Sequence, residues 1–352
     1  MLRTRARRLA LAVALCGSLA GCHGREPAPA AGQPIVLRYA SSYPPNHPFS
    51  KADIAWMNEV ERRSAGRLRI QPYWGGTLIS NDEATLELAH GVADLALVTP
   101  IYDRAGMTAV KIQAGFYAGA ETPAQQIAVY KCLAGRFPIL DEEMAGVTVL
   151  AIQGGSQLNL LTRRRPVTTL ADFRGLRIRT PSEIAPLLRS LGADPVTMPM
   201  AEVYSALSKG VIDGVVAPPD TLSSLHFNEV APYLNAWSIP RGAYPGRAIS
   251  NKALARLPAD LQSLLKASQP YWEAQLNASV EHGEKAGLAF GHAHHEHFLA
   301  VPADQQASFI RQYNAASLGR AMALSGAKFD AKAMFEEAAR AVAAQRSGRP
   351  AC

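Results

Sequence analysis

An arginine at the end of a short β run is the residue of this chain best placed to bind a charged ligand. Residues 176–180 form the run, which Gly175 opens and Pro181 stops. Arg179 stands at the carboxyl end of this predicted strand, and open α/β sheets bind ligands in the crevice outside such ends. A guanidinium there can direct two N–H donors onto a carboxylate. The alternative is that Arg179 is one more solvated charge in an arginine-rich segment.

The residues after Arg179 predict the helices and strands that would position it. Ser182 and Glu183 can cap a helix that ends at Gly192. The next predicted elements are a strand, a helix and a strand, over residues 196–198, 201–209 and 211–216. This alternation favours parallel strands with right-handed crossovers, so the sequence predicts an α/β fold.

An earlier segment repeats the end of this block. Residues 91–94 and 210–213 both read Gly-Val-x-Asp after a predicted helix, and each leads through a short apolar strand to a proline. Glycine suits a helix C-terminus, and apolar strands suit burial on both sheet faces. Two similar α/β lobes in one chain predict strand ends that face each other across a cleft, although an accidental repeat of common αβ patterns is the alternative.

The block from Asp172 to Pro218 resembles the DctP family, the extracytoplasmic solute-binding subunits of TRAP (tripartite ATP-independent periplasmic) transporters. Its three motifs are an R-x-P strand end, L-G-A-x-P-x-x-M, and E-V-Y-x-A-L-x-x-G-x-x-D-G. The matching residues of this chain are Asp172, Gly175, Leu176, Arg179, Pro181, Leu191, Gly192, Ala193, Pro195, Met198, Glu202, Val203, Tyr204, Ala206, Leu207, Gly210, Asp213 and Gly214. The resemblance extends more weakly over nearly all of the rest of the chain after the N-terminal segment.

This resemblance implies a two-lobed α/β fold of the periplasmic-binding-protein type (type II), with a ligand cleft between the lobes and a long bracing helix. The expected first lobe covers residues 34–156 and 243–283. The expected second lobe covers residues 157–242 and 284–346, and residues 347–352 form a tail. By the same resemblance, Arg179 occupies the position of the arginine that binds the ligand carboxylate.

Further contact positions follow from the family's order. Ser42, Thr99 and Tyr102 match positions that often touch ligand. Asn81, which follows a Gly-Gly turn, is a further candidate contact. Each of them is otherwise a plain loop residue. Trp237 lies in a segment, residues 225–249, that is rich in loop-forming residues; it can stack on a ligand, although a tryptophan there more often belongs to the core.

The chain departs from the family at two expected ligand contacts. Several members carry a second arginine about where this chain has Asn159, and an asparagine commonly bonds the ligand where this chain has Ala217. A site built for a polyhydroxylated acid would leave polar groups unpaired without those contacts. We therefore expect a less polar pocket and a smaller or more apolar carboxylate, unless Asp220 and Thr221 compensate.

The N-terminus predicts export and lipid attachment. Four arginines precede a short apolar segment that ends in Leu-Ala-Gly-Cys at residues 19–22 and looks like a bacterial lipobox. Residues 1–21 would be removed, Cys22 would carry lipid, and residues 22–33 would form a tether. The alternative is an ordinary secretory signal with an accidental cysteine. Removal of these arginines lowers the formal charge from +7 to about 7 − 4 = +3, so the basic composition does not indicate nucleic-acid binding.

Two other groups of residues leave alternatives open. Cys132 and Cys352 remain after processing, and an exported compartment permits a disulfide between them. Four histidines, His292, His294, His295 and His297, can bind metal weakly or lie exposed on a long helix; the spacing does not match HExxH. We expect no metal and no other cofactor.

The sequence therefore predicts a solute-binding subunit rather than an enzyme. It contains no P-loop, G-x-G-x-x-G or G-x-S-x-G motif. We expect a lipid-anchored protein on the periplasmic side of a bacterial membrane that captures an organic acid and delivers it to the TRAP membrane subunits. A ligand sensor that docks on a membrane receptor is the first alternative, and an exported α/β enzyme is the second.

Overall fold

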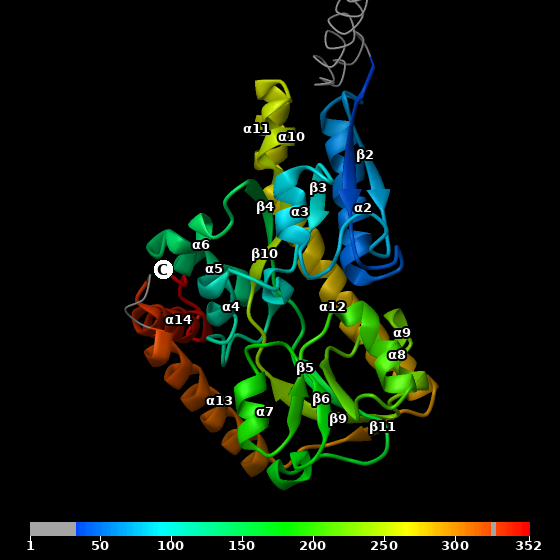
Figure 1. Ribbon diagram of the computed structural model, residues 1–352, viewed down its shortest axis with the longest axis vertical. Coiled ribbons are helices and arrows are strands. Elements are labelled where there is room, and N and C mark those ends of the chain that lie inside the picture. The colour runs from blue at the N-terminus through cyan, green and yellow to red at the C-terminus, as the bar shows by residue number, and fades with distance from the viewer. Residues whose placement is uncertain (1–32, 325–328) are drawn as a thin grey trace, which may run out of the picture. The chain divides into compact units, whose positions relative to one another are not determined.

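Two β-sheets organise the chain in the computed structural model, which describes residues 33–324 and 329–352 (Figure 1). The predicted signal segment and Cys22 lie outside the described residues, and the contacts below lie within Val36–Cys352. In sheet order, the strands of the first sheet are β2 (Leu68–Tyr73), β1 (Ile35–Ala40), β3 (Leu95–Leu97), β10 (Tyr244–Ser250) and β4 (Val147–Gln153). Those of the second are β11 (His297–Leu299), β9 (Tyr233–Ile239), β5 (Leu158–Thr162), β8 (Gly214–Ala217), β6 (Arg177–Arg179) and β7 (Asp194–Val196).

The strand that carries Arg179 has the predicted parallel neighbours. β6 pairs in parallel with β7 and with β8, and the helices between them are α7 (Ala185–Ser190) and α8 (Val203–Ser208). The predicted cap of α7 is wrong. Its N-cap residue is Ile184, and no side chain accepts a hydrogen bond there, because the residues after Pro181 form a turn before the helix begins.

The repeated Gly-Val-x-Asp segments have the same structure in both sheets. Asp94 accepts a hydrogen bond from the backbone N–H of Arg38 in β1 at 2.8 Å, and Asp213 accepts one from the backbone N–H of Arg177 in β6 at 2.8 Å. In each case the aspartate precedes a strand, β3 or β8, that pairs in parallel with the strand it caps. The repeated segment therefore has the same structural role twice: in each sheet its aspartate ties two parallel strands to each other.

Two strands lie where the sequence indicates loops. Residues 233–239 form β9 and residues 244–250 form β10, which joins β3 and β4 in antiparallel pairing. Pro245 made this segment look like a loop, because proline lacks a backbone donor. In the structure it stands beside a register shift, where a strand tolerates that loss. β10 thus returns the chain from the second sheet to the first.

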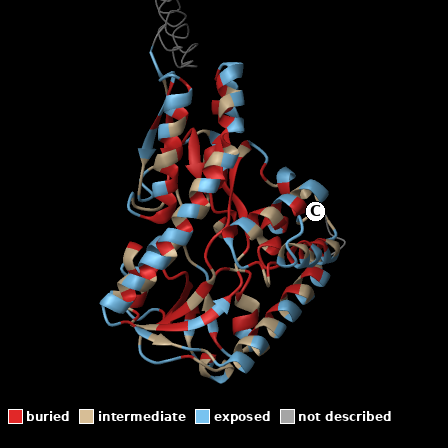
Figure 2. Ribbon diagram, turned by 180° about the vertical axis from the view of Figure 1, so that it is seen from behind, coloured by how far each residue is buried: buried red, intermediate tan, exposed pale blue. Residues whose placement is uncertain are grey.

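The helices cover these sheets and carry the apolar core (Figures 1 and 2). Figure 2 shows the strands as largely buried and the long helices as alternately buried and exposed. The helices not yet given are α2 (Pro48–Arg63), α3 (Ala84–His90), α4 (Thr108–Gln113), α5 (Pro123–Arg136), α6 (Ile139–Glu142), α9 (Thr221–Ser224), α10 (Asn251–Ala255), α11 (Ala259–Ala267), α12 (Gln269–Ala293), α13 (Ala303–Leu324) and α14 (Ala331–Arg346). Among the described residues no helix is long and apolar enough to cross a bilayer.

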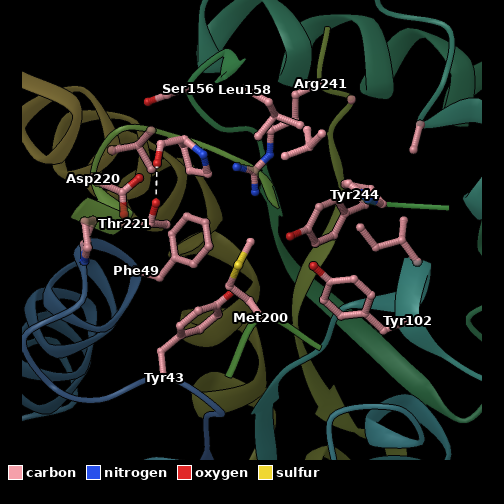
Figure 3. Close-up of a pocket in the computed structure, with 18 of the residues that line it drawn as sticks. Tyr43, Phe49, Tyr102, Ser156, Leu158, Met200, Asp220, Thr221, Arg241 and Tyr244 are labelled. Carbon is pink, nitrogen blue, oxygen red and sulfur yellow. Dashed lines mark hydrogen bonds between the residues drawn. The ribbon is translucent and has the colours of Figure 1, made fainter. Parts of the chain in front are cut away.

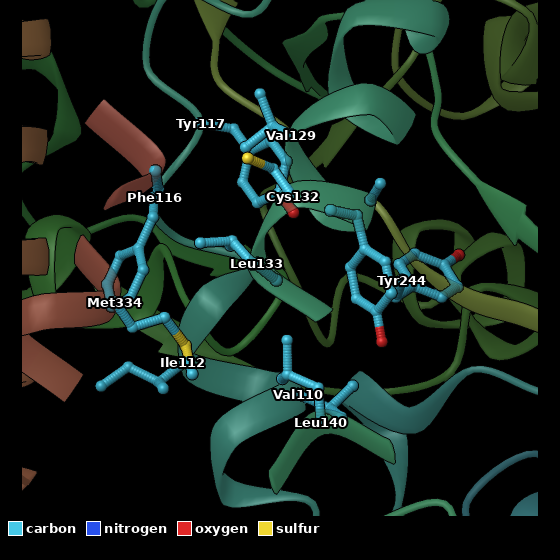
Figure 4. Close-up of a cluster of buried hydrophobic side chains, with 14 of the residues drawn as sticks. Val110, Ile112, Phe116, Tyr117, Val129, Cys132, Leu133, Leu140, Tyr244 and Met334 are labelled. Atoms are coloured by element: carbon cyan, nitrogen blue, oxygen red, sulfur yellow. The ribbon is translucent and has the colours of Figure 1, made fainter. Parts of the chain in front are cut away.

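One core cluster joins α4, α5, α14 and β10 (Figure 4). Val110, Leu133 and Met334 belong to it, as does Tyr244, which also lines the cavity described below. We expected residues 284–346 in the second lobe, but the apolar face of α14 packs on α5, from the segment expected in the first. The other bounds expected for the lobes stay a prediction.

A buried ion pair fixes the first sheet to its helices. Asp53 of α2 accepts hydrogen bonds from Arg247 of β10 at 2.7 and 3.1 Å, from Tyr39 at 2.6 Å and from Trp272 of α12 at 2.9 Å. Asp53 and Arg247 are both fully buried. Because every donor around this carboxylate is paired, the cost of burying two charges is offset, whereas loss of one partner would leave an uncompensated charge.

The long helix α12 packs against α2 and α9 through a row of glycines. A methyl group on Gly283 would lie 2.6 Å from the Pro48 side chain, and one on Gly287 would lie 2.3 Å from the backbone oxygen of Pro219. Pro270 stands in the first turn of α12, where a missing N–H costs little, so it does not interrupt the helix. α12 thus contacts the segments that follow β1 and β8.

Two of the four clustered histidines stack on aromatic rings, and the two described cysteines are unpaired. His292 stacks on Phe298 at 3.9 Å and His294 on Phe290 at 3.8 Å, and the described residues contain no metal-holding group of three. Cys132 and Cys352 are free thiols. Burial, with Cys352 as a neighbour, raises the pKa of Cys132 to about 12.

The glycine row predicts an asymmetric response to alanine. Gly287→Ala should lower the free energy of unfolding by about 1–3 kcal/mol, because the backbone oxygen of Pro219 cannot move away as a flexible side chain would. Gly319→Ala in α13 is the matched control: its added methyl meets nothing within 4 Å, so it should raise stability by up to about 1 kcal/mol. Urea unfolding of both variants measures this, and equal effects would contradict close packing at Gly287.

Candidate ligand-binding site

A cavity lies among side chains from both sheets (Figure 3). The loop after β1, the turn η1 (Pro100–Tyr102) and β10 supply one part of its lining, and the ends of β6 and β8 supply another. The space left is about 40 Å³. Its polar and aromatic lining residues are Tyr43, His47, Phe49, Tyr102, Ser156, Arg179, Glu183, Asp220, Thr221, Arg241 and Tyr244, and its apolar ones include Ile101, Leu158, Met200 and Val216.

Arg179 is fully buried at the end of β6 and is held by neutral groups. Its Nε donates to the carbonyl oxygen of Met198 at 3.0 Å, its Nη1 to that of Val216 at 3.4 Å, and its Nη2 to the hydroxyl of Tyr102. Tyr102 belongs to η1, next to the first sheet, so this last bond joins the two sides of the cavity. Arg177, two residues earlier in β6, is half-exposed and pairs with Asp194 instead.

Arg241 supplies a second guanidinium, which points into the cavity (Figure 3). It lies flat on the backbone of Gly155: a methyl group there would meet its Cζ at 2.4 Å. Its Cζ also lies 5.9 Å from the centre of the Phe49 ring. Gly155 is therefore required by the close approach of this side chain, and the joint between β4 and β5 sets where the guanidinium stands.

The hydroxyls of three tyrosines converge near these guanidiniums (Figure 3). Tyr244 accepts a hydrogen bond from Gln153 Nε2 at 2.6 Å, and Gln153 in turn accepts one from Arg247 at 2.6 Å. The buried ion pair of Asp53 thus orients Tyr244 through one intermediate side chain. Burial raises the pKa of both Tyr43 and Tyr244, so these hydroxyls stay neutral and can donate.

Burial shifts the pKa of each acidic and histidine side chain of the cavity toward its uncharged form. Burial raises the pKa of Asp220 to about 6 and raises that of Glu183. Burial, together with the positive charges of Arg247 and Arg241, lowers the pKa of His47 to about 3. His47 Nε2 lies 3.8 Å from Asp220, but a neutral imidazole makes this a polar contact rather than an ion pair at neutral pH.

The two guanidiniums make the cavity a site for an anion. No carboxylate among the described residues forms an ion pair with Arg179 or Arg241, whereas Arg247 is neutralised by Asp53. Opposite charge is worth most where water is excluded. A ligand carboxylate would supply the missing countercharge and accept the free N–H groups.

The structure brings two of the predicted contact residues to this cavity, Arg179 and Tyr102. The other six do not line it. Ser42 and Asn81 lie in loops of the first sheet, and Thr99 precedes η1. Asn159 and Ala217 face each other across the β5–β8 pair, while their neighbours Leu158 and Val216 reach the cavity. Trp237 is buried between Phe173 and Phe309 and donates to the carbonyl of Val167 at 2.7 Å.

Several lining residues escaped the sequence-based prediction. Arg241 stands in a Pro-Arg-Gly segment between β9 and β10, a pattern that marks a tight turn but gives no direction for the side chain. Arg241 gives the cavity a second guanidinium beside that of Arg179, although this chain has Asn159 where several family members carry their second arginine. Ser42 was the residue predicted in the segment after β1, yet Tyr43, His47 and Phe49 are the residues that line the cavity from that segment. Glu183, predicted as a helix cap, lines the cavity.

Asp220 predicts a specific pH dependence of stability. Its pKa is raised from 3.8 to about 6, so the protonated side chain favours the folded state: this contribution is present below about pH 3.8 and is lost as the pH rises through 6. Relative to Asp220→Asn, which does not titrate, the wild type should lose up to about 3 kcal/mol between pH 4 and pH 7. Urea unfolding at both values measures it. Exposed Asp304→Asn is the control, and an unchanged difference for Asp220→Asn would refute the assignment.

Comparisons with known proteins agree with this architecture. The family model for bacterial extracellular solute-binding proteins, family 7 (DctP), matches residues 39–316. The C4-dicarboxylate-binding periplasmic protein DctP of Rhodobacter capsulatus is 27% identical over 289 residues, 80% of this chain and 85% of its own length. The 2,3-diketo-L-gulonate-binding periplasmic protein YiaO of Escherichia coli is 34% identical over 149 residues, 41% of this chain and 44% of its own.

Solved structures show the same fold at lower identity. A TRAP solute-binding protein of Rhodoferax ferrireducens, in complex with benzoate, superposes with a TM-score of 0.77 at 22% identity and covers 89% of this chain and 99% of its own. One from Bordetella bronchiseptica, with bound mandelate, gives 0.75 at 21%, covering 86% and 97%. The family resemblance drawn from residues 172–218 is confirmed: the chain belongs to the DctP family of bacterial extracellular solute-binding proteins.

Proposed function

We propose that this protein binds a small organic acid in the cavity and that Arg179 and Arg241 bind its carboxylate. The observation that carries the proposal is that two guanidiniums face one enclosed cavity with no carboxylate of the described residues paired to either. Relatives support the class of ligand, since the proteins of known structure bind benzoate, mandelate and galacturonate.

Arg179 is the stronger anchor of the two in this proposal. Two backbone carbonyls and Tyr102 fix its plane before any ligand arrives, so little conformational entropy remains to be lost on binding. The N–H groups that these three acceptors leave unused are available to the ligand, because a guanidinium carries five. Tyr102, which spans the cavity, would then contact the same carboxylate.

The rest of the lining favours an acid with an apolar body. Phe49, Ile101 and Leu158 line the cavity beside the guanidiniums, and Met200 and Val216 add further apolar surface. The several hydroxyls of a sugar acid would in part lie against these five apolar side chains, which offer no hydrogen-bond partner. We therefore propose a small monocarboxylate with an aromatic or aliphatic body.

The wider role rests on the family and on the N-terminus. We propose that the protein is exported, is anchored by lipid at Cys22, and delivers its ligand to TRAP membrane subunits. The two sides of the cavity come from segments of two different sheets. A ligand with higher affinity for a closed arrangement of these sides can therefore shift the population from open to closed. The closed form would be the one that the membrane subunits accept.

Arg179→Ala tests the site. It should weaken binding of a cognate acid by about 2–5 kcal/mol, at least about 30-fold in Kd, because it removes a buried charged partner. Arg177→Ala is the matched control, from the same strand but half-exposed, and should bind like the wild type. Isothermal titration with the acid that gives the largest thermal shift measures both. Equal affinities of the Arg179 variant and the control would rule out Arg179 as the anchor.

Cys22→Ser tests the anchor. The full-length variant should move from the membrane fraction to the soluble periplasmic fraction, because the thioether-linked lipid is lost. Cys16→Ser, which changes a cysteine inside the predicted signal, should leave the protein membrane-bound. Mass spectrometry of the mature N-terminus gives the second readout. Absence of diacylglycerol on the wild-type N-terminus would refute lipid attachment.

A further inference from the structure

Glu183 brings an acceptor to the cavity that the protein itself does not satisfy. The side chain lines the cavity with Arg179 and Arg241 and is about nine-tenths buried, with an exposed fraction of 9%. Its Oε2 atom is buried and has no hydrogen-bond partner among the described residues. An unpaired buried oxygen of this kind costs about 1–3 kcal/mol, more when charged, so its presence in a ligand cavity calls for an explanation.

A hydroxyl of the same cavity lining is also buried and without a hydrogen-bond partner. Ser156, in the joint between β4 and β5, is 2% exposed, and its Oγ has no partner among the described residues. It follows Gly155, on which Arg241 rests. Glu183 and Ser156 thus both line the cavity, and each carries a buried polar atom without a partner among the described residues.

A carboxylate alone would leave Glu183 unpaired. A ligand carboxylate accepts hydrogen bonds, as an ionised Glu183 does, so the two groups cannot satisfy each other. The ligand needs a second group that donates. An ammonium is disfavoured because it would enter a cavity that already holds the charges of Arg179 and Arg241. A hydroxyl carries no charge and both donates and accepts, so it can pair with Glu183 whether that side chain is ionised or protonated.

Resting on the proposed function, we infer that the cavity selects hydroxy-substituted monocarboxylic acids, with Glu183 as the residue that recognises the hydroxyl and Ser156 as an additional partner. The carboxylate binds Arg179 and Arg241, the hydroxyl binds Glu183, and the apolar body lies against Phe49 and its apolar neighbours. Glu183 thus determines specificity, while the arginines supply most of the affinity.

Matched pairs of acids test this inference directly. The probes are mandelate and 3-hydroxyphenylacetate, each compared with phenylacetate, and 3-hydroxybutyrate compared with butyrate. Isothermal titration of the wild type should show at least a tenfold tighter Kd for the hydroxylated member of one pair, because a site that binds a hydroxyl rejects the analogue without it. Equal affinities within every pair would overturn the inference and would indicate that water satisfies Glu183.

Variants of Glu183 separate recognition from folding. Glu183→Met, of similar length and apolar, should bring the affinity ratio of the best pair close to one, and Glu183→Gln should keep part of it. Glu202→Gln, an exposed glutamate, is the control and should keep the full ratio. Without ligand, Glu183→Met should melt no lower than the wild type, because it removes an unpaired buried carboxylate. A ratio unchanged in Glu183→Met would overturn the assignment.

The outcomes distinguish this inference from the proposal on which it rests. If the wild type binds phenylacetate or butyrate as well as their hydroxylated partners, the carboxylate site stands and the role of Glu183 falls. If no acid of any pair binds, both fall together.

Discussion

The free-energy cost of burying a guanidinium without an ion-pair partner is the main constraint on this structure. Three arginines lie at the interface of strands, helices and cavity, and the protein treats them differently. Arg247 is paired with Asp53 and serves the framework, whereas Arg179 and Arg241 are held by carbonyls, aromatic rings and hydroxyls. An unpaired buried charge is tolerated only where something else is gained. In this protein, affinity for an anion is that gain.

The paired charges of Asp53 and Arg247 help to hold the cavity wall around the unpaired guanidiniums of Arg179 and Arg241. The bonds of Asp53 run from α2 through Arg247 to Gln153 and then to Tyr244 at the cavity wall. On the other sheet, Asp213 fixes the start of the strand whose end carries Arg179. The glycines of α12 let the segments after β1 and β8 approach one helix closely. Rigid elements of both sheets thus meet around a small cavity, the arrangement that preorganisation requires.

Sequence reasoning found what local patterns specify. The parallel unit around Arg179 and the repeated Gly-Val-x-Asp segment follow from turn residues and apolar runs, and both are present in the structure. Tyr244 could not be found this way, because it begins a return strand, β10, whose Pro245 made the segment look like a loop, and Arg241 stands in the turn just before that strand. Asn159 and Ala217 show another limit: a strand's alternation places their neighbours, not them, at the cavity. The direction of Glu183 depended on a turn, Pro181 to Ile184, that delays the helix.

The most direct test of the account compares organic acids with their uncharged carboxamides on the chain from residue 33 onward. Benzoate against benzamide and phenylacetate against phenylacetamide differ in charge but hardly in shape. A ligand at a hundredfold excess over its Kd stabilises the folded state by about 2.7 kcal/mol, which thermal unfolding detects. Two unpaired guanidiniums predict that an acid raises the melting temperature and that its amide does not. Equal shifts for acid and amide, or none for any acid, would contradict the claim that the cavity is built around these charges.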